Sequence, residues 1–210
     1  MHVLCRLLPL RANASTGLVA DFSDVGQDYQ GDVLVWEVLR GTLQFDTWVV
    51  PSAAIIASAT LSVYVSSKIT DSPFNLVVVS GSCLASTIVV ADYGELASAT
   101  TNFGSMGSGT IAASAYNNLA LSSSAITEIA KGGTTRFGLR TSRDIGSNTP
   151  KLNGSTYYEV VSIWDHTTVN KPKLIVTYTL ARKGYVWIEN TDKHYFDESN
   201  AERYTTGTAV

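Results

Sequence analysis

Residues 38–66, with the sequence VLRGTLQFDTWVVPSAAIIASATLSVYVS, decide the fold class of this 210-residue chain. After Ser58, apolar and polar residues alternate, and the two sets are Ala59, Leu61, Val63 and Val65 against Thr60, Ser62, Tyr64 and Ser66. A period of two that is rich in β-branched residues predicts a half-buried β-strand. Pro51 has no N–H group to donate, so it separates this strand from an earlier one that ends at Asp46.

Further alternating segments predict an all-β fold, an antiparallel β-sandwich of jelly-roll type over residues 15–181. The other strands are expected at residues 3–8, 33–46 (one long strand or two), 74–80, 116–121, 135–142, 157–164 and 172–180. One short helix is predicted at residues 123–131, with serine N-caps and an apolar stripe formed by Ile126, Ile129 and Ala130. Residues 11–32 are predicted as a polar, turn-rich connection. Residues 91–115 are the least regular part, with a helical turn or short helix followed by a Gly/Ser loop.

The alternation also assigns side chains to faces. The predicted core includes Leu61, Val63, Phe137, Leu139, Leu174 and Val176. Three arginines, Arg40, Arg136 and Arg140, are expected to project from strand faces and not to form an anion pocket. Residues 1–14 are predicted as an N-terminal strand or arm, and residues 182–210 as a C-terminal β-hairpin extension.

Three ordered segments resemble the DNRLRE domain family, a group of β-sandwich modules of which some bind carbohydrate. The first runs from Arg40 through Phe45-Asp46 to the PSAAIIASATLSVYV stretch, the second is FGLR at residues 137–140 with Arg143-Asp144, and the third is PKLIVTY at residues 172–178. The resemblance covers roughly residues 20–180 and implies a β-sandwich. Similar segments occur in bacteriophage structural proteins, which makes a virion role an expectation of the resemblance.

Composition narrows the classes of function. Hydrophobic residues make up 45% of the chain and charged residues 16%, which excludes wholesale disorder. The formal net charge is −3 and the basic residues are scattered, so nucleic-acid binding is not expected. The apolar runs have the length of strands, far short of the roughly 20 residues of a membrane helix. Arg6, Pro9 and Arg11 interrupt the N-terminal apolar run, so we predict no signal peptide and expect synthesis in a host cytoplasm.

Reactive and metal-binding residues form no recognisable catalytic motif. His2, His166 and His194 are far apart, and neither G-x-S-x-G nor C-x-x-C is present, so we expect no enzyme activity and no cofactor. Cys5 and Cys83 are interpreted as buried or half-buried small apolar residues, with a disulfide between them or between subunits as the alternative. Asp21, Asp24 and Asp28 are candidate calcium ligands, but we favour turn and capping roles for them and predict no metal site.

Two non-enzymatic hypotheses remain. In one, a carbohydrate-binding module or adhesin recognises a surface glycan by stacking sugar rings on aromatic faces and surrounding them with polar groups. The candidate residues for such a site are Trp36, Trp48, Tyr157, Trp164, Arg136, Arg140 and Asp144.

In the other hypothesis, which we favour, the chain is a non-enzymatic virion structural protein. It would be a capsid decoration, collar or tail-fibre component whose partners are other virion proteins and copies of itself. Two aromatic runs joined by Asn190-Thr191-Asp192-Lys193 predict a β-hairpin that begins at Tyr185. Since a two-stranded hairpin is barely stable alone, it must pack on its own sandwich or on another chain. We favour attachment to another chain through Tyr185, Trp187, Tyr195 and Phe196.

Overall fold

A computed structural model describes residues 2–8, 22–30, 35–84, 90–147, 157–164, 169–180, 187–189, 192–196 and 202–205. These residues form fourteen strands and three helices, and the strands pair in antiparallel fashion. The strands are β1 His2–Leu8, β2 Phe22–Gln30, β3 Val35–Leu39, β4 Gly41–Asp46, β5 Ala54–Thr70, β6 Asn75–Ser80, β7 Gly104–Gly107, β8 Ala115–Ala120, β9 Thr134–Thr141, β10 Tyr157–Trp164, β11 Lys173–Leu180, β12 Trp187–Glu189, β13 Asp192–Phe196 and β14 Glu202–Thr205. The helices are α1 Val90–Ser98, α2 Ser123–Glu128 and α3 Ser142–Ile145.

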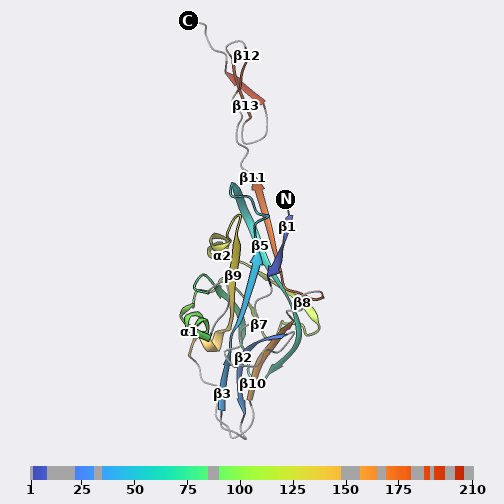
Figure 1. Cartoon of the computed structure of the whole chain (residues 1–210). Helices are drawn as coiled ribbons and strands as arrows, with labels where there is room; N and C mark the ends of the chain where they lie inside the picture. The colour runs from blue at the N-terminus through green and yellow to red at the C-terminus, as the bar shows by residue number, and fades with distance from the viewer. Residues whose placement is uncertain are drawn as a thin grey trace.

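The strands of the main body form two layers that share β1 (Figure 1). The order is β3-β2-β10-β5-β11-β1-β4-β9-β6-β7, and β8 adds to β5. Residues 2–5 of β1 pair with β11, and residues 6–8 of the same strand pair with β4. We call the layer formed by β3, β2, β10, β5, β8 and β11 the β5 sheet. The layer formed by β4, β9, β6 and β7 is called the β9 sheet. This arrangement confirms the predicted all-β, antiparallel, sandwich-like fold, and it places β1 inside the sandwich.

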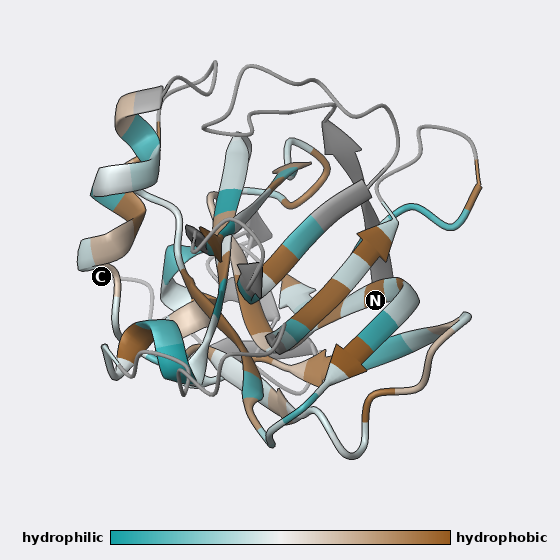
Figure 2. Ribbon diagram, turned by 90° about the horizontal axis from the view of Figure 1, so that it is seen from below, coloured by the Kyte–Doolittle hydropathy of each residue, from teal (hydrophilic) through white to brown (hydrophobic). Residues whose placement is uncertain are grey.

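The long strand β5 organises its sheet. It pairs with β11 through residues 54–62, with β8 through residues 60–65 and with β10 through residues 65–70. The alternation predicted from the sequence holds, because Leu61, Val63 and Val65 are fully buried. The other four predicted core residues, Phe137, Leu139, Leu174 and Val176, are fully buried as well. Seen from below, hydrophobic and hydrophilic residues alternate along the strands (Figure 2).

Helix α1 covers the outer face of the β9 sheet and creates a second, smaller core. Val77 and Val79 of β6 pack there with Leu84 and with Leu96 of α1. Gly138 makes this close approach possible, because a Cβ atom at that position would lie 2.3 Å from the Leu96 Cδ1 atom. Both faces of the β9 sheet are therefore covered at this point.

The helices differ from the prediction of one short helix. The predicted helix at 123–131 is α2, which ends at Glu128. Its N-cap, Ser122, accepts a hydrogen bond from the Ala125 N–H group. Within the segment 91–101, predicted as a helical turn or a short helix, residues 91–98 are helical in α1. Helix α3 has only four residues and thus no periodicity to detect; the hydroxyl of Thr141 caps it by accepting from the Asp144 N–H group.

Two segments predicted as loops are strands. Within 11–32, residues 22–30 form β2, which pairs with β3 on one side and β10 on the other, and the predicted Gly/Ser loop contains the edge strand β7. The β2 strand separates the calcium candidates: Asp24 and Asp28 are four residues apart in an extended strand, hence roughly 13 Å. Ca²⁺ ligands lie about 2.3–2.6 Å from the ion, so these two cannot share one. Asp21 lies outside the described residues, which hold no group of three potential metal ligands.

Two further expectations are corrected. Cys83 is a free, exposed thiol rather than a buried or half-buried residue; Cys5 lies in β1. The C-terminal extension contains the predicted hairpin as β12 and β13, but β14 adds a third strand, so the sheet has the order β12-β13-β14 where two strands were expected. Figure 1 shows β12 and β13 beyond the end of β11.

Candidate functional site

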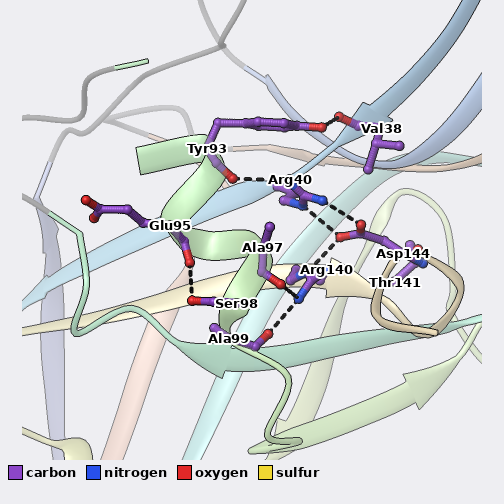
Figure 3. Close-up of polar contacts among 10 residues, drawn as sticks. All are labelled: Val38, Arg40, Tyr93, Glu95, Ala97, Ser98, Ala99, Arg140, Thr141 and Asp144. Atoms are coloured by element: carbon purple, nitrogen blue, oxygen red, sulfur yellow. Dashed lines mark hydrogen bonds and ion pairs between the residues drawn. The ribbon is translucent and has the colours of Figure 1, made fainter. Parts of the chain in front are cut away.

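Two arginines and one aspartate form a buried cluster, which we call the Arg–Asp clamp: Arg40, Arg140 and Asp144 (Figure 3). Arg40 follows β3, Arg140 lies in β9 and Asp144 lies in α3. Arg40 donates from Nε to Asp144 Oδ2 at 2.8 Å and from Nη2 to Oδ1 at 2.7 Å. Arg140 Nε donates to Oδ2 at 2.6 Å. The side chains are only 10%, 3% and 5% exposed for Arg40, Arg140 and Asp144, so two positive charges share one carboxylate largely away from water.

The same arginines hold helix α1 in place. Arg140 Nη1 donates to the carbonyl oxygens of Ala97 at 2.8 Å and Ala99 at 2.7 Å, and Arg40 Nη1 donates to that of Tyr93 at 3.0 Å. The last turn of α1 contains no basic residue. Arg140 therefore supplies, from a neighbouring strand, the positive charge that the carbonyl end of a helix favours.

Tyr93 completes the attachment of α1. Its hydroxyl donates to the Val38 carbonyl oxygen at 2.8 Å, and the Arg40 guanidinium lies 4.3 Å from the centre of its ring. Burial raises the pKa of the Tyr93 phenol, which keeps it a hydrogen-bond donor. Figure 3 shows α1 held by contacts from the β3–β4 connection and from β9.

The clamp keeps Asp144 ionised. Burial alone would raise the pKa of this carboxyl group, but the hydrogen bonds from Arg40 and Arg140 outweigh it, and the pKa lies below its ordinary value. The hydrogen bond to Asp144 raises the pKa of Arg40 despite its burial. Since both carboxylate oxygens accept from guanidinium groups, Asp144 serves as a fixed anion that joins α3 to the β9 sheet.

This geometry corrects the expected position of the arginines. Arg40 and Arg140 converge on one carboxylate instead of projecting separately, and the anion site that they form is filled by Asp144. The alternation had placed Arg140 on the face opposite Phe137 and Leu139, and it does lie there. Helix α1 covers that face, however, so Arg140 is only 2% exposed. Arg136 stays half-buried on the sheet face and donates from Nε to Gln44 Oε1 at 3.1 Å.

A second buried ion pair, which the sequence analysis missed, extends the clamp. Arg143 Nε lies 2.6 Å from Glu159 Oε1, and the Glu159 side chain is fully buried in β10. Arg143 and Asp144 are neighbours in α3, so this short helix contacts one sheet through each of them. The alternation of β10 does place Glu159 on the same face as Val161 and Ile163, which is the signal that could have revealed its burial.

The described aromatic candidates for glycan binding lie apart from the clamp. Trp48 is 70% exposed in the turn after β4. Trp164 is half-buried in β10, with its ring centre 6.5 Å from that of Tyr64 in an edge-to-face arrangement. Tyr64 is in turn 5.4 Å from Tyr116, and the Lys173 ammonium lies 3.9 Å from the Tyr116 ring centre. These three half-buried rings therefore contact one another, and Lys173 contacts the outermost of them, Tyr116.

Strand register aligns the remaining two aromatic candidates with a third residue. Trp36 pairs with Tyr29, and Tyr29 pairs with Tyr157, so the three positions form a row across β3, β2 and β10. Paired positions lie on the same face of a sheet. The sequence analysis named Trp36 and Tyr157 but missed Tyr29, because it interpreted residues 11–32 as a loop.

The C-terminal sheet gathers aromatic residues by the same rule. Trp187 pairs with His194, His194 pairs with Tyr204, and Phe196 pairs with Glu202. Since strand positions alternate, Trp187, Phe196 and Tyr204 occupy positions on one face of this sheet, and Tyr195 occupies a position on the other. Tyr185, the remaining attachment candidate, lies outside the described residues.

Comparisons with known proteins do not place the chain in a family. The sequence matches none of the protein-family models with which it was compared, and a search of curated proteins found no match. None of the helices in the described part of the chain is long and apolar enough to span a membrane.

Proposed function

We propose that this chain is a non-enzymatic structural protein of a bacteriophage virion that assembles with copies of itself and with other virion proteins. The observation that carries the proposal is the small C-terminal sheet. Within the described residues, β12, β13 and β14 pair only with one another, whereas β1 to β11 are joined into one sandwich. Residues 187–205 are thus a separate element at the end of a complete fold.

Such an element has little capacity to stabilise itself. Its strands contain three, five and four residues, and a sheet this small has almost no area to bury. Apolar and aromatic positions on one of its faces favour contact with another protein surface. Its edge strands also offer main-chain hydrogen bonds to a strand from a neighbouring chain.

The resemblance of residues 137–145 and 172–178 to segments of phage structural proteins supports the virion part of the proposal. The buried charges support the structural part. The clamp binds Asp144 to two arginines, and the second pair binds Glu159 to Arg143, so these ionisable groups hold helices to sheets. A rigid sandwich with an appended adhesive element suits a decoration, collar or fibre subunit.

Deletion of residues 184–210 tests the assembly. Size-exclusion chromatography with light scattering should give an oligomer for the full chain and a monomer for the truncated chain, with a β-rich circular dichroism spectrum in both. Assembly of the truncated chain into an oligomer with the same number of copies as the full chain would show that residues 187–205 are not the attachment element. Mass spectrometry of washed, purified particles of the phage that encodes this sequence should detect the chain, and its absence from them would refute the virion role.

One observation favours glycan recognition as a second candidate function. The row of Trp36, Tyr29 and Tyr157 positions spans three adjacent strands, and aromatic rings are the surfaces on which sugar rings stack. In affinity electrophoresis through polysaccharide gels, a glycan-binding chain would be retarded, and Trp36→Ala and Tyr157→Ala would abolish the retardation. Trp48→Ala is the control, because Trp48 lies outside the row. Equal mobility of all chains on every polysaccharide tested would exclude this function for these residues.

A further inference from the structure

Exposed apolar side chains gather at one end of the sandwich. The described residues include six large hydrophobic side chains that are at least half exposed, and four of them lie at the end where β11 finishes: Trp48 70%, Val49 55%, Ile55 59% and Leu180 52%. We call these four residues the apolar end. Large exposed apolar side chains that gather at one end of a fold favour contact with another protein surface.

Strand pairing places the four residues at the same end. Ala54 pairs with Leu180 and Ile55 pairs with Thr179, so the start of β5 lies beside the finish of β11. The turn that carries Trp48 and Val49 follows β4, whose last residue, Asp46, pairs with Arg6. From there β1 runs back to His2, which pairs with Thr177 near the same finish. Figure 1 shows the start of β1 beside the finish of β11, on the side of the C-terminal strands.

The other two exposed hydrophobic residues lie elsewhere and provide a contrast. Ile69 pairs with Val160 in β10, fourteen residues along β5 from Ile55, which is roughly 46 Å in an extended strand. Val169 belongs to the connection between β10 and β11. Ile55 and Ile69 are therefore the same residue type in the same strand, 59% and 50% exposed, at opposite ends.

The path of the chain indicates what covers the apolar end. The chain leaves the sandwich at Leu180 and enters β12 at Trp187, seven residues later, so these residues can be separated by at most about 25 Å. By the proposed function, the C-terminal sheet contacts a second copy of the chain. The β11 end of each copy then lies within about 25 Å of that contact, which is close enough for the two apolar ends to meet. A single interface can then bury both surfaces.

We propose that the apolar end is a contact surface between copies of this chain, continuous with the interface formed by residues 187–205. The inference rests on the proposed function and makes it specific: copies associate end to end or side by side at the β11 end, with Trp48 and Ile55 buried between them. The β3–β2–β10 end, which carries Ile69, points away from the interface.

The test compares Ile55→Lys with Ile69→Lys in the full-length chain. Each variant places the same charge on the same strand, so a general effect on strand formation or solubility would affect both. Sedimentation velocity over a dilution series measures the dissociation constant. Ile55→Lys should raise it by at least about tenfold, because an unpaired charge then enters the interface, while Ile69→Lys should leave it unchanged. Trp48→Lys, in an exposed turn, should act like Ile55→Lys and replaces that variant if it does not fold.

The possible outcomes separate the two proposals. Assembly that requires residues 184–210 but is equally tight in wild type, Ile55→Lys and Trp48→Lys would overturn the inference and leave the proposed function intact. Equal weakening by Ile55→Lys and Ile69→Lys would also overturn it. A wild-type chain that stays monomeric at every concentration would overturn both.

Discussion

Replacing Asp144 with asparagine removes the single negative charge on which two buried arginines converge. The substitution keeps the size of the side chain, so packing around α3 changes little. Asparagine has one acceptor oxygen, whereas three N–H groups of Arg40 and Arg140 now point at the two carboxylate oxygens at 2.6–2.8 Å. Its amide NH₂ group would meet a guanidinium donor, and both positive charges would remain buried.

The structure sets the expected size of the effect. Asp144 and Arg140 have side-chain exposures of 5% and 3%, so solvent offers them little screening. Removing one partner of a buried ion pair costs about 3–5 kcal/mol, most of which reflects the unpaired charges left behind. For a chain of 210 residues this corresponds to a fall in melting temperature of about 6–20 °C. Loss of the Arg140 and Arg40 geometry should also loosen α1.

Urea denaturation and thermal melts followed by circular dichroism measure this change. Asp46→Asn is the matched control: the Asp46 Oδ1 atom accepts from the Trp48 N–H group at 3.0 Å in an exposed turn, and asparagine can keep that contact. We expect it to alter the free energy of unfolding by less than about 0.5 kcal/mol. If Asp144→Asn lost no more stability than Asp46→Asn, the clamp would not be a buried, mutually dependent cluster.

Three further predictions follow from the core and the clamp. Because the pKa of Asp144 is lowered in the folded state, its contribution to the free energy of unfolding is present above its unfolded pKa of about 4 and is lost as the pH falls through the folded-state pKa. The difference in stability between wild type and Asp144→Asn should therefore be constant near neutral pH and shrink below about pH 4, as urea denaturation at a series of pH values would measure. Phe137→Ala and Leu174→Ala, both at fully buried positions, should each cost roughly 2–5 kcal/mol in urea denaturation; unchanged melting temperatures would mean that the strand faces are reversed. Gly138→Ala places a Cβ atom 2.3 Å from Leu96 Cδ1 and should cost about 1–3 kcal/mol, and a double-mutant cycle with Leu96→Ala should show strong coupling; additive effects would mean that α1 does not pack over Gly138.

Period-two alternation predicted most of the sandwich because long-range packing and local pattern agree along its central strands. β5 and β11 each bury one face, and the sequence of each shows it directly. β2 escaped prediction because it carries Asp24, Gly26 and Asp28 among few apolar residues. Its strand conformation comes from β3 and β10, which pair with it on both sides, and this is tertiary information that the segment itself does not contain.

The Arg–Asp clamp also depends on tertiary contacts that local sequence patterns do not contain. Alternation predicts that Arg140 lies on the face of β9 opposite the sandwich core, but it cannot predict that α1 covers that outer face. Arg40 and Asp144 are 104 residues apart, so their contact is invisible to any local pattern. The sequence analysis nevertheless noted Arg40, Arg140 and Asp144, because they belong to segments that resemble one family. The structure gives these noted residues a shared physical role.

The proposed assembly would place stability and association at opposite ends of β4. Arg40 immediately precedes β4 and belongs to the clamp, whereas Trp48 follows β4 and belongs to the apolar end. The clamp is buried and held by charge-assisted hydrogen bonds that the chain completes by itself. The four residues of the apolar end are at least half exposed, and β12, β13 and β14 pair only with one another among the described strands. A subunit built in this way can fold fully before it meets its neighbours, because its buried charges need no second copy, and its association can then depend on the β11 end without altering the sandwich.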